Sequence, residues 1–257
     1  MSDGLRTALR GLGQTLITCG VVLLLFVVYE LQVTGLVTAR EQDQLGDALR
    51  RSWAEPAARP VPAPPSPAPT SVPSPVASAQ PEPSSPAPVA PPAPAAQPVV
   101  QPDLGDAIAV LHVPSLAGFD PWVVVEGTSL EDLKSGPGHI RGTAQPGEVG
   151  NVVLSGHRTT YGAPFARLDE LRPGDRVVLE TRDRWFTYSV TGTQIVSPYA
   201  IEVTYPVPGR RGATPTEQLL TLTTCHPRYS ARQRMVVQAT LTAEQGKDAG
   251  PPEGVRA

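Results

Sequence analysis

A proline-rich run at residues 54–103 limits where this chain can fold. It is rich in Pro, Ala, Ser and Val and holds more than half of the chain's 31 prolines. Proline lacks a backbone N–H, and the run has too few large apolar side chains to offset chain entropy. We therefore predict a disordered linker at 54–103 that favours extended polyproline II and acts as a spacer. A proline-rich ligand for a binding module is the alternative, but the run has no interleaved pattern of basic residues.

The chain before the linker contains an apolar run, LGQTLITCGVVLLLFVVYELQ, about as long as a helix that crosses a bilayer. We predict a cytoplasmic N-terminus at 1–11, a transmembrane anchor helix at 12–36 and a juxtamembrane segment at 37–53. A cleaved signal peptide is the alternative, because VTA at 37–39 resembles a cleavage site. That tripeptide lies about ten residues beyond the apolar core, which favours an uncleaved anchor.

The basic residues that flank the apolar run suggest an orientation. Arg6 and Arg10 lie close before the run, whereas Arg40, Arg50 and Arg51 follow it at a greater distance. Positive residues near a span favour the cytoplasmic side. We therefore expect a single-pass protein of the cell membrane with its folded domain outside the cell.

The folded domain is predicted at 104–242, followed by a disordered tail at 243–257. Short apolar stretches separated by turn sequences such as RPGD and VPGRRG predict a mainly β domain, either a closed barrel or a sandwich. Two short helical pieces are expected at 129–136, capped by Ser129, and at 163–174. The seven predicted strands are 107–113, 121–127, 151–156, 175–181, 184–196, 218–225 and 233–241.

Composition excludes several functions for this domain. The net charge of −3 gives no basic footprint for nucleic acid. The sequence contains no P-loop, no dinucleotide-binding glycine pattern and no CxxC pair. With one cysteine and scattered histidines, the domain has little from which to build a metal site. We expect no cofactor, no metal and no nucleic-acid partner.

Cys225 is the residue that most needs a chemical explanation. It ends the strand QLLTLTTC, and the only other cysteine, Cys19, lies in the predicted membrane span. No intramolecular disulfide is then available, and lone thiols are unusual outside the cell. We interpret Cys225 as a nucleophile. The non-enzymatic alternative is a wall-binding β-domain in which Cys225 is a buried apolar residue.

A nucleophilic thiol needs a basic partner, and His157 is the best candidate. The strand NVVLSG ends just before His157, as the strand QLLTLTTC ends at Cys225, so both side chains can meet at one rim. His226 should point to the opposite face from Cys225. His112 and His139 are expected to be ordinary surface or rim residues.

An arginine is expected to stabilise the oxyanion of an acyl-transfer intermediate. Arg228 and Arg232 lie in the loop after Cys225, whereas Arg234 opens the next strand, where the backbone is better fixed. We therefore favour Arg234 and expect the other two to be solvated.

The segments SGHRTTYGAPF, TLTTCHP and QRMVV, in that order, resemble the sortases, membrane-anchored cysteine transpeptidases of Gram-positive bacteria. The wider pattern over 108–241 is most similar to class E sortases of high-GC species. The resemblance implies an eight-stranded β-barrel with Cys225 as nucleophile, His157 as general acid and base, and Arg234 as the oxyanion and substrate ligand. It also implies hydrolase-like thiol protease chemistry in the first half-reaction.

The resemblance further implies the substrates and partners. A C-terminal LPxTG-type signal, or LAxTG for class E, would be cut between Thr and Gly, and the surface protein would pass to the amine of a lipid-linked peptidoglycan precursor. Tyr161 would shape the pocket for the second motif residue, and Thr223 and Thr224 would line the groove. A pilin-polymerising sortase is the alternative within the family. The cysteine contexts of L,D-transpeptidases and papain-like proteases do not fit.

Overall fold

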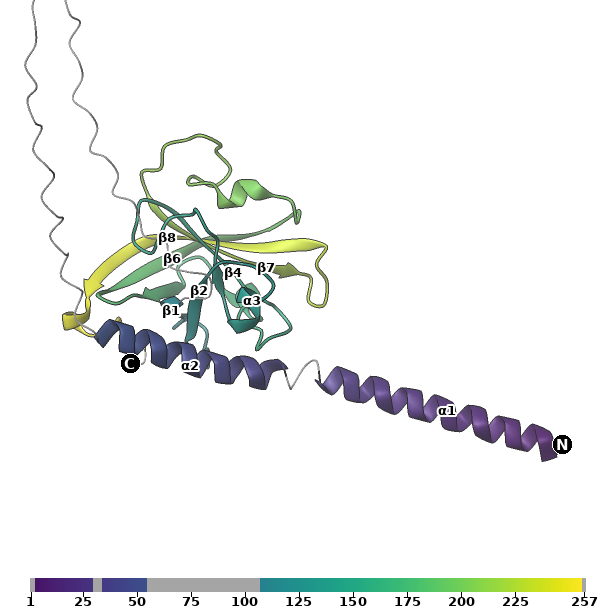
Figure 1. Cartoon of the computed structure of the whole chain (residues 1–257). Coiled ribbons are helices and arrows are strands. Elements are labelled where there is room, and N and C mark those ends of the chain that lie inside the picture. The colour runs from purple at the N-terminus through teal and green to yellow at the C-terminus, as the bar shows by residue number, and fades with distance from the viewer. Residues whose placement is uncertain (1–2, 30–33, 55–106, 256–257) are drawn as a thin grey trace, which may run out of the picture. The chain divides into compact units, whose positions relative to one another are not determined.

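The computed structural model describes residues 3–29, 34–54 and 107–255 (Figure 1). Apart from Ala54, the predicted linker lies outside the described residues. Helix α1 (Asp3–Val28) contains one stretch, Arg10–Val28, that is long and apolar enough to cross a membrane. The anchor predicted at 12–36 overlaps this stretch and extends beyond it: α1 ends at Val28, residues 30–33 are outside the described part of the chain, and a second helix, α2 (Thr34–Ala54), follows.

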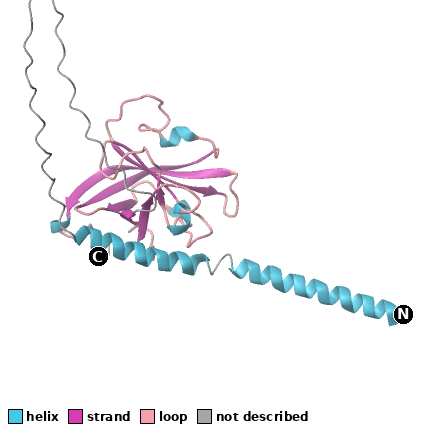
Figure 2. Cartoon of the chain, viewed as in Figure 1, coloured by secondary structure: helices cyan, strands magenta, loops and turns pink. Residues whose placement is uncertain are grey.

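Most of the folded domain consists of strands (Figure 2). They form a closed barrel in the order β1-β2-β3-β4-β7-β8-β6-β5. Most neighbours are antiparallel, but β4 pairs parallel with β7, and β2 with β3. All seven predicted strands are present. The strands are β1 (Ala107–His112), β2 (Trp122–Glu126), β3 (Gly138–His139), β4 (Gly150–Ser155), β5 (Arg176–Glu180), β6 (Arg184–Val196), β7 (Gln218–His226) and β8 (Gln233–Gly246).

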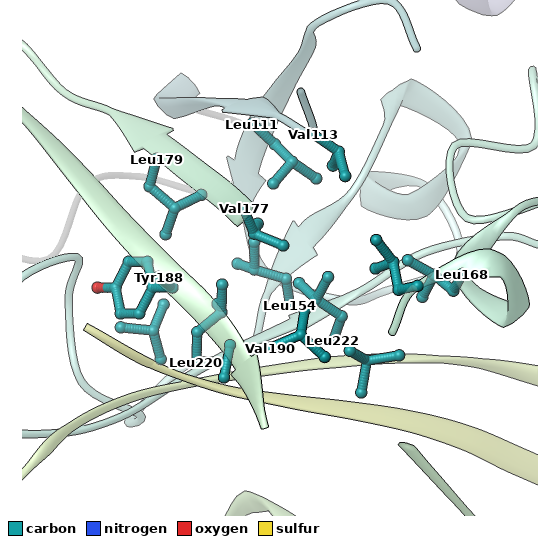
Figure 3. Packing of buried hydrophobic residues seen from close by; sticks show 14 of the residues in the cluster. Leu111, Val113, Leu154, Leu168, Val177, Leu179, Tyr188, Val190, Leu220 and Leu222 are labelled. Carbon is teal, nitrogen blue, oxygen red and sulfur yellow. The ribbon is translucent and has the colours of Figure 1, made fainter. Parts of the chain in front are cut away.

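The barrel interior is filled by alternate side chains of these strands (Figure 3). Leu220 and Leu222 of β7 meet Leu154 of β4 and Tyr188 of β6, and all four are at most 1% exposed. Burying each such side chain stabilises the fold by about 1.5–3 kcal/mol. Because alternate residues of β7 fill the interior, the intervening ones face outward.

The short helical elements are shorter than the sequence suggests. The predicted helix at 129–136 is α3 (Asp132–Ser135), whose N-cap residue is Glu131 and not Ser129. Ser129 lies one turn earlier and exchanges two hydrogen bonds with Asp132: its Oγ accepts from the Asp132 N–H at 3.2 Å, and the Asp132 carboxylate accepts from the Ser129 N–H at 2.8 Å. Of the piece predicted at 163–174, only the 3₁₀ turn η2 (Leu168–Glu170) forms.

Within the described residues, which end at 255, the tail predicted as disordered at 243–257 is instead part of the domain. Strand β8 continues to pair with β6 as far as Gly246, and the turn η4 (Lys247–Ala249) follows. Lys247 pairs with Glu180, and its Nζ lies 4.2 Å from the centre of the Trp185 ring. A cation over an indole ring is attracted by the ring's negative face. These contacts explain why a polar sequence is ordered here.

Candidate active site

Cys225 lies at the end of β7 and is half-buried. Leu220 and Leu222 point into the barrel, so alternation places Thr221, Thr223 and Cys225 on the outer face. Both cysteines of the chain are free thiols. The thiol is therefore on the outside of the barrel at one rim, where it can meet a substrate.

The parallel pairing of β4 with β7 brings His157 to the same rim. Ser155 pairs with Thr223, and the Gly156 N–H donates to the Thr223 carbonyl at 3.1 Å. Extending this register by two residues sets His157 across from Cys225, with both side chains on one face. His157 and Cys225 therefore each lie two residues beyond the Ser155–Thr223 pair, at the same end of neighbouring strands.

The loop that follows β4 fixes His157. Phe165, which is fully buried, donates its N–H to the His157 carbonyl at 3.0 Å. The ring of Tyr161 lies 4.9 Å from the His157 ring at an interplanar angle of 38°. Tyr161 also has a left-handed backbone, with φ of 51°, a costly conformation that is typical of functional loops. Burial lowers the pKa of His157 below its usual value of 6.5.

His112 and His139 are not the surface or rim residues expected from the sequence. His139 is fully buried, and its Nδ1 lies 2.8 Å from Glu126 Oε2. His112 is 6% exposed, and its Nε2 lies 2.8 Å from Glu180 Oε2. The expectation was wrong because each histidine has a carboxylate partner on a neighbouring strand of the barrel, and a polar group can be buried when it is hydrogen-bonded.

Arg234 is the direct cross-strand partner of Cys225 in the β7–β8 pair, so the two side chains share a face. Its Nη1 donates to the carbonyls of Ala231 and Gln233 at 3.0 and 3.1 Å. The guanidinium is therefore turned toward the β7–β8 turn and would have to exchange these bonds to reach a substrate. Arg228, in contrast, donates to the Ala166 carbonyl at 2.6 Å.

Thr223 and Thr224 lie on opposite faces of β7. Thr223 shares the outer face with Cys225 and is 9% exposed. Thr224 is 2% exposed and donates its hydroxyl to the Gly156 carbonyl at 2.7 Å. Thr224 therefore does not line an open groove in this structure. Its hydrogen bond ties the end of β7 to the residue before His157.

The segment between β6 and β7 covers the outer face of β4 and β7. Buried Asn151 donates to the carbonyls of Val203 and Tyr205 at 3.0 and 3.1 Å, and accepts from the Thr221 hydroxyl at 2.8 Å. The short turn η3 (Ile201–Thr204) belongs to this segment. A cavity of about 370 Å³ beneath it includes Thr221 in its lining, which is on the same face of β7 as Cys225.

Arg158 is a residue that sequence reasoning missed. It follows His157 directly and is only 5% exposed. Its Nη1 donates to His226 Nδ1 at 2.9 Å and to the Cys225 carbonyl at 3.4 Å, and its Nη2 lies 3.1 Å from Asp169 Oδ1. The Arg158 cation thus joins the end of β4 to the end of β7. The only sequence signal is an arginine next to the candidate base, and nothing in that pattern indicates burial.

We expect Arg158→Gln to slow alkylation of Cys225 at pH 7 by about tenfold, because the thiolate loses a cation held beside its backbone. The free energy of unfolding should fall by about 1–3 kcal/mol, since the buried charged hydrogen bonds are lost. Iodoacetamide labelling followed by peptide mass analysis measures the rate. Arg167→Gln is the matched control, because Arg167 pairs with Glu170 on the surface. A folded Arg158→Gln protein that alkylates at the wild-type rate would contradict this role.

Known proteins that are similar to this chain are sortases. The sortase domain family matches residues 111–242. Sortase SrtE2 of Streptomyces coelicolor is 31% identical over 97% of this chain and 88% of its own length. Sortase SrtE1 of the same species is 29% identical over 96% of this chain, and the chain spans 61% of the length of SrtE1.

A solved structure supports the same assignment. The crystal structure of sortase E1 from Streptomyces coelicolor with a tripeptide in the active site has a TM-score of 0.54 and 33% sequence identity. That likeness covers 58% of this chain and 96% of the solved chain. The eight-stranded barrel implied by the sequence resemblance is therefore confirmed. The chain belongs to the sortase family, and it resembles the class E members of that family.

Proposed function

We propose that this chain is a membrane-anchored cysteine transpeptidase. It cleaves a C-terminal sorting signal of the LAxTG or LPxTG type between Thr and Gly, and it transfers the protein to the amine of a lipid-linked peptidoglycan precursor. The observation that carries the proposal is the β4–β7 register, in which Ser155 pairs with Thr223, so that His157 and Cys225 each follow this pair by two residues at the same end of the two strands. Family membership and the tripeptide in the active site of sortase E1 support it.

The first half-reaction makes a thioester. The Cys225 thiolate attacks the carbonyl of the motif threonine, and Arg234 stabilises the oxyanion. When the Thr–Gly C–N bond breaks, the His157 imidazolium gives its proton to the departing glycine amine. The products are a thioacyl enzyme, a free amine and a neutral imidazole. Because burial lowers the pKa of His157, only a minority of molecules hold the thiolate and imidazolium together at neutral pH.

The second half-reaction reverses these roles. An amine of the precursor attacks the thioester and loses a proton to neutral His157, and the thiolate of Cys225 departs as the new amide forms. A thioester is a good acyl donor to amines, so a site that restrains water favours transfer over hydrolysis. The cycle ends with the thiolate and imidazolium restored.

Substrate contacts are proposed along the outer face of β7. Thr223 lies two residues before Cys225 on that face, and the cavity beneath the β6–β7 segment continues it toward Thr221. Tyr161 flanks His157 on the other side. An extended peptide laid along this face would place its scissile bond at Cys225 with its preceding residues toward the cavity.

The anchor is proposed to be α1, through Arg10–Val28. The side chains of this stretch that are described are almost all exposed, which suits contact with lipid. The orientation follows from Arg6, which precedes the span, and Arg10, which is its first residue. The catalytic domain would then lie outside the cell, where sorting signals and precursor meet.

We expect Tyr161→Ala to change the preference between LAxTG and LPxTG peptides by at least about fivefold, because removing the ring opens space beside His157. Turnover of the two peptides in competition measures the ratio. Tyr161→Phe should keep the wild-type ratio if ring volume sets it. Tyr199→Ala is the matched control, since Tyr199 is 87% exposed. An unchanged ratio in Tyr161→Ala would remove this role.

The proposed function is tested with the full chain in nanodiscs, mixed with LAxTG and LPxTG peptides and a diamino acceptor. The expected result is a peptide–amine product that requires both Cys225 and the acceptor. Hydrolysed peptide alone, even at high acceptor concentration, would show a protease and not a transpeptidase. A folded protein that cuts neither peptide would refute the substrate assignment.

A further inference from the structure

Helix α2 lies where a juxtamembrane segment was predicted, and one face of this helix is buried or half-buried. Thr38, Gln42, Leu45, Leu49 and Trp53 follow one another at intervals of three or four residues, which places them on one side of a helix. Each of the five is buried or half-buried. The opposite side of the helix is charged and exposed.

The N-terminal half of α2 is held by hydrogen bonds to the barrel. The Thr38 hydroxyl donates to the Lys134 carbonyl at 2.9 Å. The Gln42 amide donates to the carbonyls of Ser135 and Val123 at 2.6 and 3.1 Å, and its oxygen accepts from the Val123 N–H at 2.7 Å. The Gln42 side chain therefore bonds both backbone groups of Val123 in β2, as a neighbouring strand would. It also bonds the carbonyl of Ser135, the last residue of α3.

The C-terminal half of α2 is held by apolar and cation–π contacts. Leu49 is 4% exposed and packs with Val110 and Val123 on the outside of β1 and β2. The Trp53 ring lies 4.8 Å from Lys247 Nζ, which Trp185 contacts from its own side. Contacts at both ends and in the middle make α2 a fixed part of the catalytic domain.

Both ends of the proline-rich segment lie at one place on the barrel. Trp53, just before it, and Ala107, just after it, pack against the same cluster of Leu49, Val110 and Val123. The described residues on either side of 55–106 therefore pack against the same cluster. For this reason the length of residues 55–106 does not set the distance between α2 and the barrel. The spacer predicted at 54–103 lies, apart from Ala54, outside the described residues.

The start of α2 lies beside the loop that holds His157. A Cβ added at Gly35 would be 4.0 Å from the Gly162 nitrogen, and Gly162 follows Tyr161. The chain between Val28, at the end of the apolar stretch, and Gly35 can reach at most about 25 Å, at roughly 3.5 Å per residue. If the proline-rich segment alone joined the barrel to the anchor, the barrel could lie as far as about 150 Å from the membrane, at ~3.1 Å per residue.

We propose that α2 is a strut that joins the membrane anchor to the barrel and holds the loop of His157 and Tyr161 close to the bilayer surface. The surface next to this loop is then the lipid headgroup layer. Substrates that are themselves anchored in the membrane would be turned over faster. This inference rests on the proposed function in one respect only: that holding the site near the bilayer speeds the capture of membrane-anchored substrates. The docking of α2 stands on its own contacts and is tested separately.

The docking is tested by hydrogen exchange on the full chain in nanodiscs. Gln42→Ala should speed exchange of the Val123 amide and of the α2 amides by at least about tenfold, because Val123 loses its acceptor and α2 loses three hydrogen bonds. Gln44→Ala is the matched control, since Gln44 is on the exposed side. Wild-type α2 amides that exchange as fast as an unfolded chain would overturn the proposal.

The placement near the bilayer is tested by lengthening the chain at two points. A Gly-Ser insertion of about twelve residues between Tyr29 and Thr34 adds roughly 20 Å of reach, and the same insertion within 61–90 is its control. The insertion between Tyr29 and Thr34 should lower turnover of a membrane-anchored sorting-signal peptide by about tenfold. It should change turnover of the same peptide free in solution by no more than about twofold. The insertion within 61–90 should change neither turnover.

The outcomes separate the two proposals. Equal turnover of the anchored peptide by both insertions, or a loss caused only by the insertion within 61–90, would overturn the strut. If the wild-type chain cuts neither the anchored nor the free peptide, the proposed function fails. Exchange at Val123 then still decides whether α2 is docked.

Discussion

Cys225→Ala should abolish peptide cleavage, lowering kcat/KM by at least about 10³-fold, because Cys225 is the only cysteine in the folded domain and the acyl intermediate is a thioester. The half-buried thiol lies outside the barrel and opposite Arg234, and the fold does not depend on it for its core. We expect the free energy of unfolding to change by less than about 1 kcal/mol. Cleavage of a fluorogenic sorting peptide measures the activity, and denaturant unfolding measures the stability.

Cys19→Ala is the matched control for this change. Cys19 lies in the apolar stretch of α1, so its removal should leave kcat/KM at the wild-type value. Residual cleavage by Cys225→Ala at a tenth of the wild-type rate would mean that the nucleophile lies elsewhere. Loss of folding by the same variant would instead favour a structural cysteine.

His157→Ala should lower kcat/KM by about 10²–10⁴-fold, the range that a general acid–base group contributes. His226→Ala is its control, because His226 is adjacent to Cys225 but accepts from Arg158 and sits beyond the catalytic face. We expect a loss of only a few-fold in that variant, through the weakened contact with Arg158. Equal losses in the two variants would leave the base unassigned.

The pH profile gives a second measure of the same role. Burial lowers the pKa of His157, so the singly protonated pair that reacts forms only above that pKa. The acid limb of kcat/KM should therefore lie below pH 6.5, with activity lost as the pH falls through it, and His157→Ala should lack this limb. A limb above pH 6.5 in the wild-type chain would contradict the assignment.

The barrel could be predicted from sequence because its strands carry strong local signals. Stretches such as those of β5 and β7 are short, apolar and bounded by turn sequences. Strand β3 escaped prediction because it has two residues, Gly138 and His139, which is too short to form a pattern. Its pairing with β2 and β4 depends on the rest of the barrel.

The elements that were mispredicted depend on tertiary contacts. The tail looked disordered because it is polar, yet Lys247 is held between Trp53 and Trp185. Helix α2 carries a regular apolar spacing, but only the barrel shows what that face covers. Local sequence carries no information about partners so distant in the chain, and tertiary contacts override propensity.

In the candidate site, too, residues with a local sequence signal could be predicted, and residues that depend on tertiary contacts could not. Cys225 and His157 could be proposed from sequence because Cys225 lies at the end of an apolar strand and His157 just after one, and strand ends tend to carry sites. The burial of Arg158 could not, because its partners His226 and Asp169 come from other parts of the chain. Thr224 looked like a groove residue until alternation along β7 placed it inside the barrel.

The most direct test of the central claim is the intact mass of the enzyme after mixing with a sorting peptide in the absence of an acceptor amine. The account predicts a thioacyl adduct that digestion maps to Cys225 and that disappears, with release of a peptide–amine product, when a diamino acceptor is added. Cleaved peptide with no adduct on the protein at any time point would contradict it.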